Sequence, residues 1–402
     1  MELNFLTIAD SAEDLQPLHQ LLGSFQSQAQ VNVSLQRIGW DRAWQTLLMA
    51  AVEGKGPQLS QIGSTWTPTL AMLEALRAFS RDEANSMGGD RHFLPQAWET
   101  VSSGDLREIN AIPWTIYTFV LFYRRDLLLR AGLDPDQVFL TPQAMREGFT
   151  RLKKDGITPW AFPSLHPYAD LVHIASSWAR ANGGDFISAD RPKPVFARPE
   201  ACRGLMDFFE LFPFMPPSAR GLSVEACTQA FARGETAVLV GGVEVADELL
   251  GSPQAAQEMR ANLGVTTLPG VPWIGGDHLV IWKNVLPNAE NEKAALELVR
   301  FLSRKETQVE FFKIQNVLPA RSDAYDEISF SLDTTLPAVR RVLETGRPHP
   351  HVRLWRRIEA FLDEMLLDIG SRVLQTSATP AADTAKEMLS QYEQKLAAVL
   401  KG

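Results

Sequence analysis

The sequence predicts an α/β protein of two lobes, each a sheet flanked by helices, and three observations indicate this class. The chain has 402 residues, more than a single hydrophobic core usually serves. Residues 3–68 alternate strand-like runs with amphipathic helices, the order typical of a parallel sheet with right-handed crossovers. A turn at Pro113 then leads into an apolar, β-branched and aromatic run at residues 116–123, typical of a buried strand that starts a second α/β unit.

The composition is ordinary for a globular protein, with 45% hydrophobic and 22% charged residues. A net charge of -9 argues against a nucleic-acid surface, which needs a basic patch. No apolar run is long enough to span a bilayer. Residues 2–10 are too short and too uncharged for a signal peptide, so we expect a cytoplasmic chain or one whose signal was removed. Cys202 and Cys227 favour two buried thiols over a bridge.

In the first lobe, residues 3–8, 31–38 and 59–62 have the patterns of strands. Apolar residues at helical spacing follow the first strand, at Leu15, Leu18, Leu21, Leu22 and Phe25. Asp10 with Glu13 forms a capping-box pattern before this helix, and we expect Thr67 to cap the third helix with Pro68 at its first position.

In sheets of this kind, ligands bind beyond the carboxyl ends of the strands. These ends carry hydrogen-bonding side chains and two indoles, in three groups: Asp10 and Ser11; Trp40 and Asp41; Ser64, Thr65 and Trp66. One Trp at a strand end is usually core packing, but two beside polar groups favour a pocket. For Asp10 the helix cap is the better interpretation.

The second unit continues the alternation. A short helix at residues 126–130 ends at Gly132, and Thr141 caps a helix that stops at Gly156. Further elements are a ring-rich strand and loop at 158–166, a helical stripe from Leu171 to a core Trp178, helices opened by Pro199 and Ser223, and a strand at 236–240. Gly241 and Gly242 follow that strand, where backbone amides can approach a ligand.

The next segment is expected to cross back to the first lobe. We expect a strand at residues 263–268, a loop at 269–278 and a strand at 279–282. Two helices follow at 291–303 and 303–314, the second opened by a capping box from Ser303 to Glu306. An extended link at 317–321 precedes a tail that is helical from Val352.

The order of these landmarks resembles the extracellular solute-binding proteins of ABC importers, in the group that mostly carries carbohydrates. The resemblance is carried by residues 113–134 with Thr141 and Pro142, by 231–242, by 268–282, and by 294–308 with Leu318 and Pro319. It spans almost the whole chain. The export signal that the family normally carries is missing, and the aromatic residues are Trp-rich where family members usually place Tyr.

The resemblance implies a two-lobe periplasmic-binding-protein fold of type II. Lobe 1 would comprise residues 1–111 and 278–320, lobe 2 residues 114–274 and 322–402, with hinges near 111–114, 274–278 and 318–322. It also implies high-affinity binding of a sugar or sugar derivative in the interlobe cleft and delivery to the permease subunits of an ABC importer. We expect a monomer without cofactor, metal or catalysis, located in the periplasm or outside the cell after signal removal.

A sugar presents hydroxyls around its ring and C–H groups on its faces, so its site needs planar polar groups and an indole. Candidates for the edge are Asp10, Asp41, Asn182, Glu244, Asp277 and His278, and for the face Trp40, Trp66, Trp114, Trp273 and Trp355. Ser11, Ser64, Thr65, Tyr117, His166, Gly241, Gly242 and Gly276 complete the proposed cleft. Arg353 and Arg321 could pair with an anionic solute, although arginines of this kind more often lie in solvated ion pairs. For each carboxylate, a helix cap or a solvated loop is the competing interpretation.

No catalytic or nucleotide-binding motif stands in the sequence. His349 and His351 flank a proline, which favours a turn over a metal site. Three alternatives stay open: a ligand sensor for a signalling partner, a glycoside hydrolase that works with two carboxylates, and a solute that is a polyol or an anionic or sulfonated glycoside.

Overall fold

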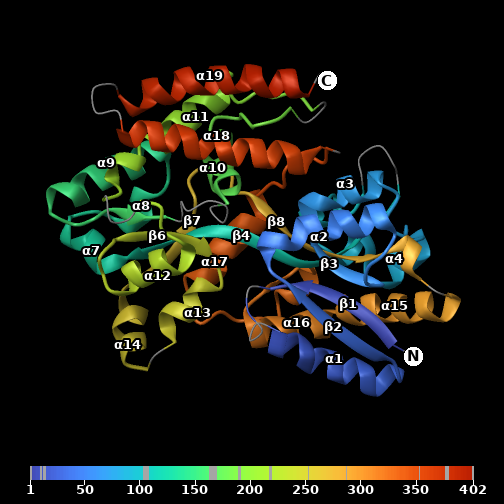
Figure 1. Ribbon diagram of the computed structural model, residues 1–402. Coiled ribbons are helices and arrows are strands. Elements are labelled where there is room, and N and C mark those ends of the chain that lie inside the picture. Colours follow the sequence, from blue (N-terminus) through green and yellow to red (C-terminus); the bar gives the residue numbers. More distant parts are fainter. Residues whose placement is uncertain are drawn as a thin grey trace. The chain divides into compact units, whose positions relative to one another are not determined.

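The computed structural model confirms the predicted α/β class (Figure 1). It describes residues 2–9, 11, 15–102, 108–162, 170–188, 192–216, 220–251, 253–286, 288–352, 354–375 and 380–400. The chain forms two compact units. Unit 1 comprises residues 1–117, 275–329 and 351–356, and unit 2 comprises 118–274, 330–350 and 357–402.

The sequence-based lobe ranges differ from these units in three segments. They placed residues 114–117, 322–329 and 351–356 in the second lobe, whereas these segments belong to unit 1. Local contacts explain the difference. The Tyr325 hydroxyl donates to the carbonyl of Pro319, and His351 Nδ1 lies 2.8 Å from the carbonyl oxygen of Ser102, both within unit 1. The hinge positions stay predictions.

Unit 1 is built on a sheet with the strand order β2-β1-β3-β8. β1 (Glu2–Ile8) pairs in parallel with β2 (Asn32–Ile38) and with β3 (Leu59–Gly63), as predicted. β8 (Ile274–Ile281) runs antiparallel to β3, with Asp277 opposite Gly63. The predicted loop at residues 269–278 was too long, because the strand already begins at Ile274. The ladder with β3 puts Asp277 and His278 inside the sheet.

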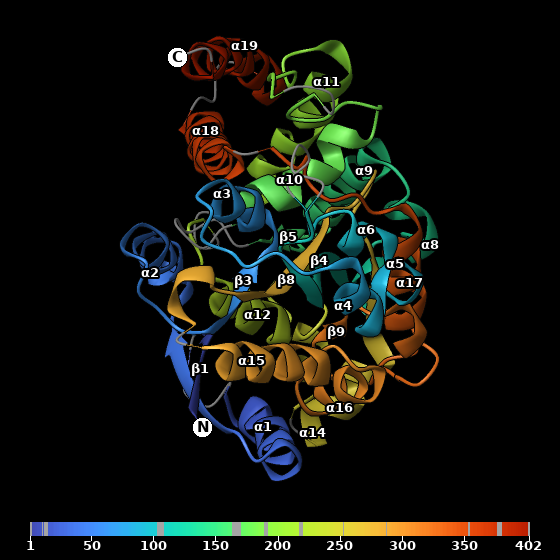
Figure 2. The ribbon, with the colours of Figure 1, turned by 90° about the vertical axis from the view of Figure 1, so that its right-hand side faces the viewer.

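Helices cover both faces of this sheet (Figures 1 and 2). α1 (Gln16–Ala29), α15 (Ala289–Leu302) and α16 (Lys305–Gln315) lie on one face, and α2 (Trp40–Glu53) and α3 (Thr67–Met72) on the other. The α2–α3 face buries Leu6, Ala43, Leu47, Ile62 and Leu70 against the strands. Short helices that the sequence did not predict follow: η2 (Ser64–Trp66), α4 (Arg81–Ser86), α5 (Gly89–His92), α6 (Pro95–Trp98), η5 (Lys283–Val285) and η6 (Ser322–Ala324).

Two predicted helix caps were wrong, each for a tertiary reason. Thr67 is the first residue of α3, not its cap, and its hydroxyl bonds to the ring of His278. Ser303 closes α15, where its hydroxyl donates to the carbonyl of Arg300, and α16 starts without a side-chain cap. In both places another partner outcompetes the local amide for the hydroxyl.

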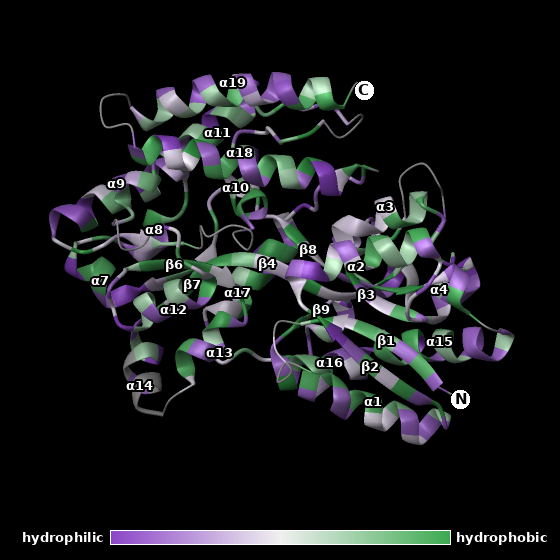
Figure 3. Ribbon diagram, viewed as in Figure 1, coloured by the Kyte–Doolittle hydropathy of each residue, from purple (hydrophilic) through white to green (hydrophobic). Residues whose placement is uncertain are grey.

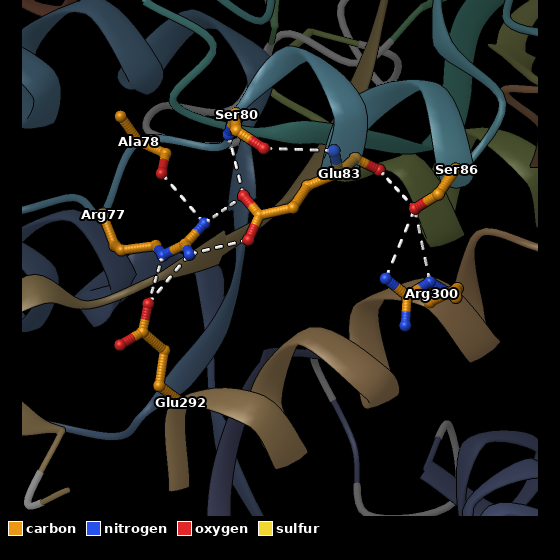
Figure 4. Close-up of polar contacts among 7 residues, drawn as sticks. All are labelled: Arg77, Ala78, Ser80, Glu83, Ser86, Glu292 and Arg300. Carbon is orange, nitrogen blue, oxygen red and sulfur yellow. Dashed lines mark hydrogen bonds and ion pairs between the residues drawn. The ribbon is translucent and has the colours of Figure 1, made fainter. Parts of the chain in front are cut away.

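An ion-pair cluster holds the first turn of α4 to α15 within unit 1 (Figure 4). Both guanidinium Nη atoms of Arg77 donate to Glu83, and Nε donates to Glu292 at 2.8 Å. Glu83 also completes a capping box with Ser80. The bonds from Arg77 are the main reason why the pKa of Glu83 falls to about 2.

Unit 2 is built around the second half of β4 (Ile112–Arg124), whose first half pairs with β9 (Leu318–Pro319) in unit 1. In unit 2, β4 pairs antiparallel with β6 (Val238–Gly242) and β7 (Leu263–Thr267), and β5 (Trp160–Ala161) lies parallel to β6. β4 extends four residues before the predicted run because Ile112–Thr115 continue the buried strand. In Figure 3, β1 and β4 are largely green, whereas the edge strand β2 carries purple residues.

The predicted helices of unit 2 are present, and α8, η3, α13, α14 and α17 are additional ones that the sequence did not predict. Thr141 and Ser223 accept the capping amides of Ala144 and Ala226 as expected, and Gly132 is left-handed with φ 65°. The helices are α7 (Arg125–Arg130), α8 (Pro135–Val138), α9 (Pro142–Lys154), α10 (Leu171–Arg180), α11 (Pro199–Phe209), η3 (Phe212–Phe214), α12 (Val224–Ala232), α13 (Val245–Leu250), α14 (Pro253–Asn262), α17 (Thr335–Thr345), α18 (Trp355–Gln375) and α19 (Ala381–Val399). The first two residues of α18 belong to unit 1.

The core of unit 2 depends on a close helix contact. Trp178 is fully buried, as its helical periodicity predicted. Its carbonyl oxygen lies where a Cβ on Gly204 of α11 would stand, so α10 and α11 approach backbone to backbone. Cys202 and Cys227 are buried free thiols, as expected. Among the described residues, no helix combines the length and the apolar character that crossing a membrane requires.

Candidate functional site

A hydrogen-bonded network joins four strands of unit 1 where the parallel strands β1 and β3 end. Gln61 Nε2 donates to Asp277 Oδ2 at 2.8 Å, and the Thr115 hydroxyl donates to the same oxygen at 2.9 Å. The carbonyl oxygen of Gln61 accepts from the Thr7 hydroxyl and from the amide of Ile8. The network therefore fixes one carboxylate at the edge where ligands of α/β sheets bind.

Asp277 is a half-buried residue of β8. Burial raises its pKa to about 6, although the bonds from Thr115 and Gln61 act in the opposite direction. Both of these bonds fall on Oδ2. Neither of these two bonds falls on Oδ1, so this second carboxylate oxygen can accept a hydrogen bond from a ligand hydroxyl.

Three indoles gather at the same edge of unit 1. Trp66 packs edge-on against Trp40 and Trp44, with ring centroids 5.7 and 5.6 Å away. Its ring also lies against Gly63, where a Cβ would come within 3.5 Å. Trp66 is 7% exposed and Trp40 39% exposed. Trp40 is therefore the predicted indole that offers most surface to a ligand.

The polar candidates beside these indoles lie in helical turns. Asp41 is in the first turn of α2, with its exposed carboxylate 3.6 Å from Arg42. Ser64 is buried and Thr65 half-buried, both in η2. Ser11 is exposed. Asp10, His166 and Arg353 lie outside the described residues.

His278 has a structural role in unit 1. Its Nδ1 lies 2.7 Å from the Thr67 hydroxyl and its Nε2 lies 3.0 Å from the Thr100 hydroxyl. Because Thr100 donates its own proton to the carbonyl of Ala97, it must accept from the imidazole, which assigns the proton to Nε2. Burial, with a smaller contribution from His351, lowers the pKa of His278 to about 3. The ring is neutral and its two nitrogen atoms are both engaged.

Other predicted residues of unit 1 are enclosed. Trp114 is 2% exposed and stacks on Phe311 at 5.2 Å, and Trp355 is 1% exposed. Neither indole therefore exposes a ring face to which a ligand could bind. Tyr117 is half-buried. Gly276 allows two backbone segments to approach closely, because its φ is 145° and a Cβ there would overlap the carbonyl of Thr115.

In unit 2, the predicted glycines belong to the sheet. Gly241 and Gly242 face Val120 and Phe119 in the ladder between β6 and β4, so they are strand residues and not a loop. A Cβ on Gly242 would overlap the carboxylate of Glu244, which folds back over it. Glu244 itself is exposed at the start of α13.

Trp273 lies in a stack of rings in unit 2. The imidazole of His173 covers one face of the indole, with centroids 3.9 Å apart and planes 7° from parallel. Phe119 and His349 lie at 6.2 and 5.8 Å, and 6% of the residue is exposed. The Trp273 carbonyl accepts from the Thr118 hydroxyl at 2.7 Å. The imidazole therefore closes one face of this indole to a ligand.

Sequence reasoning named Asp277 as a candidate but did not name Gln61 and Thr115, which bond to it, or Thr7, which bonds to Gln61. Thr7 and Gln61 are polar residues near the ends of buried parallel strands, a placement that strand reading alone could have flagged. His173 carried no signal beyond its place in an apolar helix.

Comparison with known proteins shows the family of this chain. The profile of a family described as "Bacterial extracellular solute-binding protein" matches residues 20–338. The diacetylchitobiose-binding protein DasA of Streptomyces coelicolor is 22% identical over 391 residues, 94% of this chain and 86% of that protein. The sn-glycerol-3-phosphate-binding periplasmic protein UgpB of Escherichia coli is 23% identical over 366 residues, 85% of this chain and 81% of that protein.

Two solved structures share the fold. The sugar-binding protein MalE of Xanthomonas citri superposes with a TM-score of 0.80 at 22% identity, over 99% of this chain and 98% of that one. Maltose-bound MalE3 of T. maritima has a TM-score of 0.80 at 19% identity, over 98% of this chain and 99% of that one. These likenesses confirm the predicted two-lobe fold class.

Proposed function

The chain belongs to the family of bacterial extracellular solute-binding proteins, and on that premise we propose that it binds a sugar or sugar derivative for an ABC importer. The relatives named for diacetylchitobiose and glycerol phosphate, and the neighbour solved with maltose, support a polyhydroxylated solute. The partners would be the permease subunits of the importer, and the protein would act as a monomer in the periplasm or outside the cell.

One observation carries the proposal: a carboxylate held by Gln61 and Thr115 at the strand ends of a unit that also carries a cluster of indoles at that edge. Asp277 Oδ1 would accept a solute hydroxyl. Trp40, the most exposed indole, would pack on the C–H face of the sugar, with Trp66 supporting it edge-on.

The remaining candidates complete the proposal. Asp41, Ser64 and Thr65 would add polar contacts from unit 1, and Glu244 and Trp273 would add contacts from unit 2. Solute that contacts both lobes would favour a closed form, with bending near residues 111–114, 274–278 and 318–322. His278, Trp114 and Trp355 would not touch solute, because the polar groups of His278 are already engaged and the two indoles are buried.

Calorimetry and thermal unfolding with a defined panel test this function. Maltose, diacetylchitobiose, tagatose, ribitol and sn-glycerol 3-phosphate cover neutral sugars, a polyol and an anion. A bound solute at a hundred times its dissociation constant should raise the free energy of unfolding by about 2.7 kcal/mol. Product analysis of the same mixtures should show the solute unchanged.

Two variants link the binding to the site. Trp40→Ala and Asp277→Asn should each weaken binding at least tenfold, while Asp155→Asn, at an exposed carboxylate of unit 2, should leave it unchanged. The proposal would be contradicted if no solute of the panel gave binding heat or thermal stabilisation. It would also be contradicted if both site variants bound solute as tightly as the parent.

A further inference from the structure

A pair of histidines in unit 2 forms a buried chain of hydrogen bonds that the proposed binding site does not use. His173, on α10, places Nδ1 2.8 Å from Nε2 of His349. Its other nitrogen, Nε2, lies 3.5 Å from a carboxylate oxygen of Glu359 on α18. On the far side, Nη2 of Arg180 lies 3.5 Å from Nδ1 of His349. His349, Arg180 and Glu359 are 4%, 3% and 6% exposed.

The partners assign every proton in this chain. A guanidinium only donates, so Nδ1 of His349 accepts from Arg180 and its proton lies on Nε2. That proton points to Nδ1 of His173, whose own proton must then lie on Nε2 and face Glu359. Both imidazoles are therefore neutral, between a cation and a carboxylate.

The charges around the pair favour this neutral state. Arg180 is fixed by the carbonyls of Arg347 and Pro348 and by the carboxylate of Asp185. Burial, followed by the effects of His173 and Arg180, holds the pKa of His349 well below its usual range. The nearby carboxylate of Asp363, on α18, accepts the amide of Val172. A second proton on His173 would lie on Nδ1 and would face the N–H group at Nε2 of His349, which is unfavourable.

Residues within three positions of four of the five borders between the units contact this pair, either directly or through Trp273. The borders fall at 117/118, 274/275, 329/330, 350/351 and 356/357. Trp273, next to the second border, stacks on His173, and its carbonyl accepts from Thr118 at the first. His349 is the second residue before the fourth border, and Glu359 is the third residue after the fifth.

The backbone beside these borders is paired as well. The amide of Ile274 donates to the carbonyl of Arg347, and the amide of Arg347 donates to the carbonyl of Pro272. Two crossing segments that are far apart in sequence thus run side by side within unit 2, and Arg180 binds the carbonyl of Arg347 from behind.

We propose that the His173–His349 pair is a hinge clamp, which ties together the unit 2 ends of four chain crossings and sets how easily these segments bend. A clamp of this kind would confine the bending of closure to the unit 1 side of the crossings. Any effect of the clamp on solute affinity depends on the proposed binding function. The existence of the clamp does not depend on that function, because it follows from contacts within unit 2.

Hydrogen exchange on the ligand-free full chain tests the clamp. His173→Phe keeps a ring against Trp273 but removes the hydrogen bond to His349 and the contact with Glu359, and His349→Gln keeps a side-chain amide near His173. We expect the amides of Ile274 and Arg347 to exchange about tenfold faster in His173→Phe and less so in His349→Gln. His19→Gln, at an exposed histidine of α1, should match the parent. Parent-like exchange in a folded His173→Phe variant would overturn the clamp.

If the His173→Phe variant does not fold, the hydrogen-bond chain can be tested by NMR on the unmodified protein. Nitrogen-15 spectra of labelled histidine at neutral pH should show His173 and His349 neutral, each with its proton on Nε2. A charged ring or a proton on Nδ1 in either residue would refute the hydrogen-bond chain. Solute titrations of the same variants then report the coupling separately, since the exchange and tautomer results need no solute.

Discussion

Replacing Asp277 by Asn should stabilise the protein at neutral pH, although it removes a charged residue from the proposed site. The Asn carbonyl can accept the bonds from Gln61 and Thr115, so the network survives. What disappears is the cost of holding an ionised carboxylate in a poorly solvated place.

The magnitude follows from the pKa of Asp277, which is raised from 3.8 to about 6 in the folded protein. A raised pKa means that the native state holds its proton more tightly than the unfolded chain. The stabilisation is complete below pH 3.8 and is lost as the pH rises through 6. Roughly two pKa units correspond to about 3 kcal/mol of unfolding free energy, as an order of magnitude.

Denaturant unfolding of the parent and of Asp277→Asn between pH 4 and pH 8 measures this. The two proteins should be close in stability at pH 4 and diverge as the pH rises, with the variant more stable by up to about 3 kcal/mol at pH 8. Asp155→Asn should give a difference that hardly depends on pH. A constant offset for Asp277→Asn, or a variant that loses stability toward pH 8, would show that the carboxylate is well solvated and that the reasoning is wrong.

Three further changes test the scaffold of the units. Glu83→Gln should cost about 1–2 kcal/mol at pH 7, after allowance for solvent screening, because the ion pair with Arg77 is lost. The loss should shrink as the pH falls from 4.5 through 2, where the parent carboxylate takes up its proton; a loss that persists at pH 2 would contradict this. Gly204→Ala should cost about 1–3 kcal/mol, since the added methyl meets a backbone carbonyl of α10, while Gly23→Ala in α1 has open space and should gain about 0.5–1 kcal/mol; equal effects would exclude the close contact. The parent should lose stability as the pH falls from 6.5 to about 3, because the unfolded chain protonates His278 more readily, and His278→Gln should flatten that part of the profile in urea titrations; an unchanged profile would place the titration elsewhere.

The elements that the sequence predicted well are those where burial alone sets the pattern. Leu18, Leu21, Leu22 and Phe25 all turn inward on α1 because helical spacing and one apolar neighbour suffice to decide that. The parallel pairing of the first three strands followed from their alternation with helices, for the same reason.

The site was harder to predict because its geometry comes from residues far apart in the chain. Gln61 and Asp277 are 216 positions apart, and nothing local to either residue announces the other. The indoles show the same limit. Trp40 and Trp114 both follow turn-like residues, yet one is 39% exposed and the other 2%, because Phe311 from a distant helix covers the second.

Asp277 and His278 show how one register separates two roles. Successive residues of a strand point to opposite faces, so neighbours in β8 meet different partners. Asp277 reaches Gln61 and Thr115 at the strand ends, whereas His278 is enclosed between two threonine hydroxyls. A slip of one residue would exchange the two and bury the carboxylate without its donors. Gly276 holds the strand against that slip, because only a residue without a Cβ can lie against the carbonyl of Thr115. The glycine of this stretch therefore contributes to the proposed site by fixing which of its two polar neighbours faces the network.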